Sequence, residues 1–93
     1  MAREREVWKF EVPPGIVHIG GVQMPVGAHI IDVAAQGAKV YVWAIVAPDA
    51  PPSHRRLGYF ATGAPIPAGW EHVGTAHLRG VSLVFHVFEE VPF

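Results

Sequence analysis

Residues 55–70 contain residue types that bind anions and nucleobases: two adjacent arginines, a Thr-Gly pair and two aromatic rings. Arginine guanidinium groups hold a phosphate or a carboxylate with paired N–H donors, and a glycine lets backbone N–H groups approach an anion closely. Aromatic rings offer stacking faces to a base. The sequence therefore predicts a ligand site, and its residues are Arg55, Arg56, Tyr59, Thr62, Gly63 and Trp70. The alternative is that the arginines are solvated and the aromatic rings belong to the core.

Six histidines raise the question of a metal site; they are His18, His29, His54, His72, His77 and His86. Zinc needs three or four ligands around one point, and the chain has no H-x-H or H-E-x-x-H motif. With Arg79-Gly80 as a two-residue turn, Val73 would face His86, and His72 would lie on the opposite face of the hairpin. A three-residue turn would place His72 and His86 on one face. We expect hydrogen-bonded or solvated histidines, no metal and no cofactor.

Groups that could act as catalysts are scattered. The two serines, Ser53 and Ser82, lie outside any G-x-S-x-G elbow, and cysteine is absent. Asp32 and Asp49 have no acidic neighbour in the sequence, and the Glu89-Glu90 pair resembles a solvated strand end. The sequence therefore predicts a protein that binds rather than an enzyme, with no catalytic residue.

Length and charge narrow the possible partners. Ninety-three residues predict one domain, residues 1–93. The net charge of −1 provides no basic field for duplex nucleic acid. No apolar run approaches the roughly 18 residues of a membrane span, so we expect no membrane partner. The absence of cysteine is consistent with a reducing cytoplasm.

Ten glycines and nine prolines divide the chain into short extended pieces. In the first piece, Trp8, Phe10 and Val12 alternate with Lys9 and Glu11, as in a strand with one buried face. Turns are expected at Met24–Gly27 and Gln36-Gly37, and the Pro48–Ser53 segment reads as a loop. Strands are expected at residues 7–12, 16–19, 29–35, 39–47, 56–62, 71–78 and 81–88. The pattern predicts an all-β fold, a single small sandwich or barrel-like antiparallel sheet of about seven strands without substantial helix.

Two of these strands, 40–46 and 83–88, are apolar on both faces. In a small β-domain with one solvent-exposed face, the strands should instead alternate apolar and polar residues. The second apolar face predicts self-association, so we expect a homo-oligomer.

Four segments form a distinctive pattern: W-A-I-V-A-P (43–48), A-T-G-A-P-I (61–66), V-G-T (73–75) and L-V-F-H-V-F-E (83–89). This pattern resembles that of a family of short phage and prophage proteins without an assigned activity. Ala47 replaces a usual acidic residue and Ala61 a usual glycine. The resemblance implies a phage setting, hence the cytoplasm of an infected bacterium.

Together, these observations predict a non-enzymatic, phage-derived binding protein. It would capture a small anionic or nucleotide-like ligand, such as a host immune signal, as a homo-oligomer. Two alternatives stay open: a protein-interaction module that inhibits a host protein, and a self-assembling accessory phage component.

Overall fold

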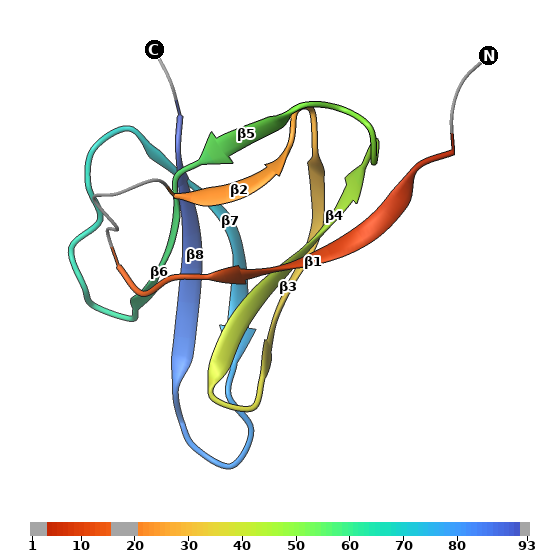
Figure 1. The fold of residues 1–93 in the computed structure, drawn as a ribbon. Coiled ribbons are helices and arrows are strands. Elements are labelled where there is room, and N and C mark those ends of the chain that lie inside the picture. Colours follow the sequence, from red (N-terminus) through yellow and green to blue (C-terminus); the bar gives the residue numbers. More distant parts are fainter. Residues whose placement is uncertain (1–3, 16–20, 92–93) are drawn as a thin grey trace.

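Every regular element in the described part of this chain is a β-strand. The computed structural model describes residues 4–15 and 21–91. Its strands are β1 (Glu6–Val12), β2 (Val22–Pro25), β3 (His29–Gln36), β4 (Lys39–Val46), β5 (Pro52–Arg55), β6 (Leu57–Ala61), β7 (Trp70–His77) and β8 (Val84–Glu90) (Figure 1). No helix in these residues is long and apolar enough to cross a membrane. The expectation of an all-β fold without helix is confirmed.

The strands form three antiparallel sheets. Sheet A has the order β1-β4-β3, sheet B has the order β6-β8-β7, and β2 pairs with β5 in a two-stranded ribbon. In sheets A and B alike, the central strand is the last of the three in sequence. The strand before it carries a bulge in both cases, between Ile30 and Asp32 in β3 and between His72 and Gly74 in β7. The two sheets therefore share one topology.

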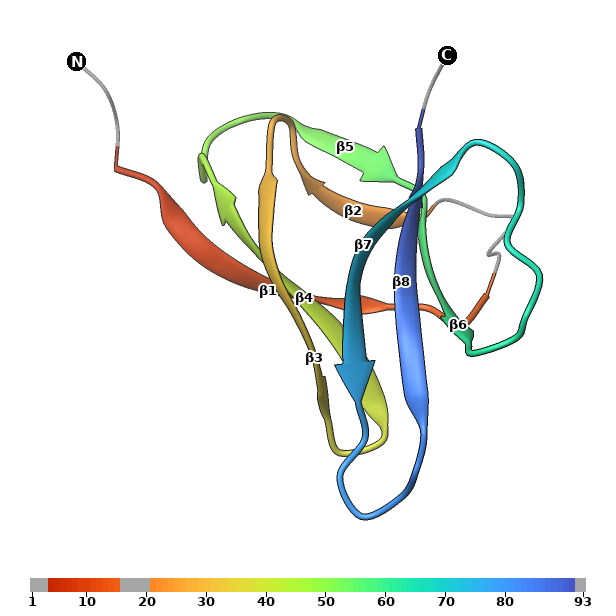
Figure 2. The same ribbon diagram turned by 180° about the vertical axis from the view of Figure 1, so that it is seen from behind.

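The core lies between sheets A and B. Val40, Val42, Ala44 and Val46 alternate along β4 and are almost completely buried, and Val87 of β8 is fully buried as well. Strands β3 and β7 lie side by side (Figure 2). Their approach is close, because a Cβ atom on Gly74 would lie 2.6 Å from Cγ2 of Val33. Glycine at this position lets the two sheets meet.

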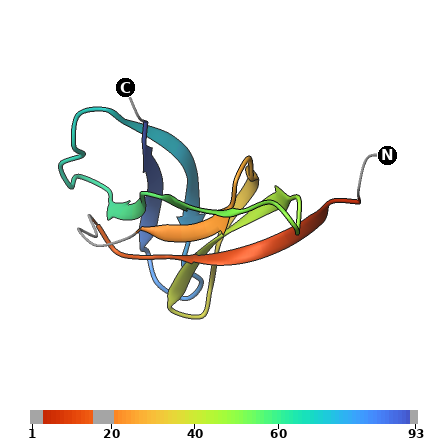
Figure 3. The ribbon, with the colours of Figure 1, turned by 45° about the horizontal axis from the view of Figure 1, so that its top comes forward.

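Two further contacts join the sheets. The residues after β1 reach β6, where the Gly15 amide donates to the Tyr59 carbonyl (2.8 Å) and the Tyr59 amide donates to the Pro13 carbonyl (3.1 Å). The β2–β5 ribbon crosses one end of the molecule (Figures 1 and 3), and Met24 of β2 is buried there. The ribbon therefore covers the end of the core.

The strand inventory differs from the sequence-based expectation in three places. The described residues form eight strands in three sheets, whereas about seven strands in a single small sandwich or barrel-like sheet were expected; β2 and β5 overlap segments assigned to a turn and to a proline-rich loop. The strand expected at 16–19 lies outside the described residues. In the last hairpin, residues 78–83 form the connection, and Thr75 rather than Val73 faces His86.

Candidate functional site

The Arg55 side chain forms hydrogen bonds that join three parts of the fold. Its Nε and Nη2 atoms donate to the two carboxylate oxygens of Glu89 on β8, at 2.5 and 2.8 Å. Its Nη1 atom donates to the Ala28 carbonyl (2.5 Å) and approaches Sδ of Met24 (3.6 Å). The hydrogen bond to Glu89 raises the pKa of Arg55, although partial burial opposes the rise. All three guanidinium nitrogens are thus engaged within the protein.

Arg56, between β5 and β6, is held more loosely. Its Nη1 atom lies 3.5 Å from Oε2 of Glu90, and its guanidinium carbon lies 6.0 Å from the centre of the Trp70 ring. The two arginines, the two glutamates and His54 line a cavity of about 290 Å³. Its two cationic and two anionic side chains balance, so the cavity carries no net positive charge to attract an anion.

The other predicted ligand residues point to different places. Tyr59 packs edge-on against Phe85 with ring centroids 4.7 Å apart, beside the core. Thr62 is six positions beyond Arg56, a distance of about 20 Å along an extended chain. Gly63 has a φ of +92° in the turn after β6, a conformation that favours glycine. Arg55 and Arg56 line one cavity and Trp70 lies beside Arg56, whereas Tyr59, Thr62, Gly63 and Trp70 are not among the residues that line this cavity.

A chain of hydrogen bonds links two histidines and two threonines on sheet B. The Thr62 hydroxyl is bonded to Nε2 of His86 (2.9 Å), and Nδ1 of His86 is bonded to the Thr75 hydroxyl (3.1 Å). The same hydroxyl is bonded to Nε2 of His72 (3.1 Å). The bulge in β7 turns His72 onto the face of His86, the one-face arrangement expected for the longer turn.

These histidines are hydrogen-bonded, which is the role that the sequence predicts for them. In residues 4–15 and 21–91, no group of three or more His, Cys, Asp or Glu side chains could hold a metal ion. Neither the arginine-lined cavity nor the groove described next is lined by Thr62, His72, Thr75 or His86.

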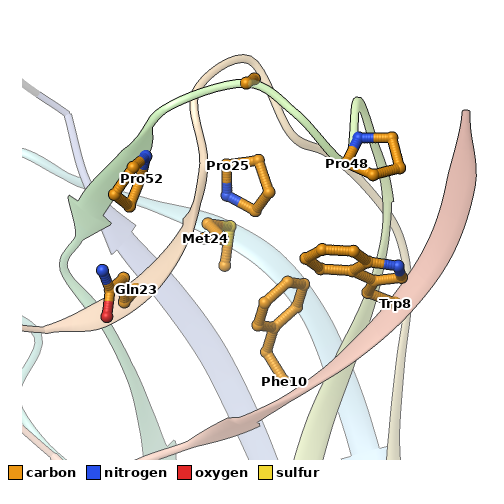
Figure 4. A pocket seen from close by; sticks show the side chains of 8 residues that line it. Trp8, Phe10, Gln23, Met24, Pro25, Pro48 and Pro52 are labelled. Atoms are coloured by element: carbon orange, nitrogen blue, oxygen red, sulfur yellow. The ribbon is translucent and has the colours of Figure 1, made fainter. Parts of the chain in front are cut away.

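A groove of about 300 Å³ that is lined mostly by apolar side chains lies between β1 and the β2–β5 ribbon, and is called here the Trp8 groove. Its lining residues are Trp8, Phe10, Gln23, Met24, Pro25, Pro48, Ala50 and Pro52. The Trp8 and Phe10 rings are 6.4 Å apart and face Met24 and Pro25 (Figure 4). The indole N–H of Trp8 donates to Oε1 of Glu6 (2.7 Å), which leaves its ring face available to the groove. Apart from the Trp8 indole, Gln23 is the one lining side chain that can form strong hydrogen bonds.

The sequence-based site did not include this groove, although part of the signal was present. The alternation of β1 correctly places Trp8 and Phe10 on one face. The prolines were assigned to loops, and nothing in their spacing shows that 24–25 and 48–52 meet above that face. None of the residues that line the groove is an acid, a base or a nucleophile.

Comparison with known proteins identifies a family for this chain. No curated protein and no solved structure matches the chain. One family model, described as "Domain of unknown function (DUF7352)", matches residues 3–93. Because this match covers nearly the whole chain, the protein belongs to the DUF7352 family.

Proposed function

We propose that this protein is a non-enzymatic interaction module that holds an apolar segment of a partner protein in the Trp8 groove. The observation that carries the proposal is the lining, which combines two aromatic rings, a methionine and three prolines with a single amide. Aromatic and methionine side chains are enriched at the centres of protein interfaces. A volume of about 300 Å³ has room for one or two side chains of a docked segment.

The same lining makes binding of an anionic ligand in this groove unfavourable. A phosphate or carboxylate that entered it would lose its hydration and would find no cation among the lining residues. In the phage setting that the sequence resemblance implies, the partner is a protein of the bacterial host, and the location is the host cytoplasm. The three small sheets act as one sandwich- or barrel-like unit that presents the groove at its end.

The three tryptophans allow a direct test, because they lie at three different surfaces. Trp8 lies in the groove, Trp70 lies beside Arg56, and Trp43 lies on the outer side of β4. Peptides of random sequence would be selected by display on the purified protein and titrated against it, with the indole N–H signals followed by NMR. We expect the Trp8 signal to shift while the Trp43 and Trp70 signals stay in place.

A matched pair of variants controls this test. Ala50 lines the groove and Ala64 does not, yet both are half-buried loop alanines whose amides donate to the carbonyl three residues earlier (3.0 Å each). Ala50→Glu should weaken the selected peptides about tenfold or more, because it introduces a charge beside apolar contacts. Ala64→Glu should leave their affinity unchanged. Equal affinity of the two variants, or peptide binding without a Trp8 shift, would contradict the proposal.

A second candidate function is capture of a small anion or nucleotide at Arg56 and Trp70. The loose pair between Arg56 and Glu90 supports it, since a separation of 3.5 Å leaves donors free to turn toward a ligand. Titration with inorganic phosphate and with AMP should then shift the Trp70 indole signal alone, and Arg56→Ala should abolish the shift. An unmoved Trp70 signal at millimolar ligand would eliminate this candidate.

A further inference from the structure

Strand β4 has a second apolar side, which faces away from the core of the described residues. Its inward residues are buried, whereas Tyr41, Trp43 and Ile45 point outward and are only half-buried. The cross-strand partners of these residues place Val7 of β1 on the same outer face. Val7 is 55% exposed, and Ile31 in the bulge of β3 is 48% exposed. The outer face of sheet A is therefore an apolar surface on the central strand of its sheet.

Polar residues surround this surface on one side. Lys9 lies over the Tyr41 ring, 4.6 Å from its centre, and donates to Oε1 of Gln36 (2.9 Å). Lys39 lies 3.5 Å from Glu11. Apolar residues with a polar rim are the usual anatomy of a protein interface, and Trp43 occupies the central strand where an anchor residue is expected.

The charges on this face favour one kind of partner. The face carries Lys9 and Lys39 together with Glu11 and Asp32, so its net charge is zero and both signs are present. A strongly acidic or basic partner would meet as many like as opposite charges. In a two-fold contact the same patch meets itself, which requires both signs on one patch.

The size of the face is also adequate for such a contact. Three strands about 4.8 Å apart and eight residues long, at about 3.3 Å per residue, present a flat area of roughly 380 Å². Protruding side chains and the surrounding polar residues add to this flat area, so two copies would bury about 1,000 Å² in total. This value is near the lower limit for a specific interface. Contacts at this lower limit are typical of weak, transient association, so we expect a dissociation constant in the micromolar range.

We propose that the outer face of sheet A, centred on Trp43, is the interface between two copies of this chain. The contact is isologous and independent of the Trp8 groove, because Trp8 and Phe10 project from the opposite side of β1. A dimer formed this way carries two grooves, and so binds a partner with two docking segments more tightly than one groove alone does.

Sedimentation velocity over a concentration range of about 5 to 500 µM tests this interface, since that range spans a micromolar dissociation constant. The wild-type protein should change from monomer to dimer as the concentration rises. Val7→Lys combined with Ile31→Lys should weaken the dimer about 100-fold or more, because it sets like charges against each other across the two-fold axis.

The chain provides a matched control for the two lysines. Val81 and Leu83 in the β7–β8 connection are 55% and 48% exposed, the same values as Val7 and Ile31, and lie outside sheet A. Val81→Lys combined with Leu83→Lys should dimerise like the wild type. A wild-type monomer at every concentration, or equal dissociation of both double variants, would overturn the proposed interface. The affinity of the Val7→Lys and Ile31→Lys double variant for the selected peptides tests the Trp8 groove separately from the dimer interface.

Discussion

Replacement of Arg55 by alanine should lower the free energy of unfolding by about 2–3 kcal/mol, between the values for exposed and for fully buried pairs. The Arg55 and Glu89 side chains are 26% and 22% exposed, so the pair is closer to the buried case. The substitution leaves the Glu89 carboxylate, the Ala28 carbonyl and the Met24 thioether without their shared partner. For a domain of this length, about 4–8 °C per kcal/mol converts the loss into a decrease in Tm of about 10–20 °C.

Arg56 provides the control for this prediction. It is the next residue and lines the same cavity, but its pair with Glu90 is longer (3.5 Å) and the two side chains are 41% and 39% exposed. Arg56→Ala should therefore cost less than about 1 kcal/mol. Urea and thermal unfolding followed by circular dichroism would measure both variants.

The pair with Glu89 also predicts how the loss depends on pH. Because the pKa of Arg55 is raised above its ordinary value, the stabilisation is fully present below that value and is lost only in strong alkali. The difference between wild type and Arg55→Ala should therefore be the same at pH 7 and pH 9. If Arg55→Ala unfolds like Arg56→Ala, the idea that Arg55 joins the ribbon to sheet B is wrong.

Two further substitutions test the packing between sheets and the histidine network. Gly74→Ala places a Cβ atom 2.6 Å from Cγ2 of Val33 and should destabilise the protein by about 1–3 kcal/mol in urea unfolding, and Val33→Ala should relieve part of the loss in the double variant. An unchanged urea midpoint for Gly74→Ala would show that β3 and β7 can separate freely. Thr75→Val removes the hydroxyl shared by His72 and His86 and should cost about 1 kcal/mol per lost hydrogen bond. The ¹⁵N signals of the His86 ring should change in that variant, and unchanged signals would contradict the bond to Nδ1.

The sequence was sufficient to predict the strands whose side chains alternate or are continuously apolar. Strands β1, β3, β4, β6 and β7 coincide with the expected ranges to within two residues at each end. The tight turn between β3 and β4 was also expected, and Gly37 adopts a φ of +60° there. Local pattern decides these elements, because each has one face toward the core or lies in the centre of a sheet.

The missed elements depend on contacts between distant segments. Strands β2 and β5 include Pro25 and Pro52, which face each other in a two-stranded ribbon where proline is tolerated. The bulge at Val73 moves His72 to the other face of β7, and no turn motif encodes such a shift. The partner of Arg55 is Glu89, 34 positions later, so its structural role cannot be read from the Arg-Arg pair.

The order of strands along the chain has a consequence for synthesis on the ribosome. Sheet A uses only residues 6–46 and sheet B only residues 57–90. The nascent chain can therefore complete sheet A before β8 has been translated, as expected when N-terminal units fold first. Until sheet B arrives, however, Val40, Val42 and Ala44 face water. A transcript truncated after β4 would therefore yield an aggregation-prone fragment. In the full chain, the strands of sheet B bury the apolar inner face of sheet A.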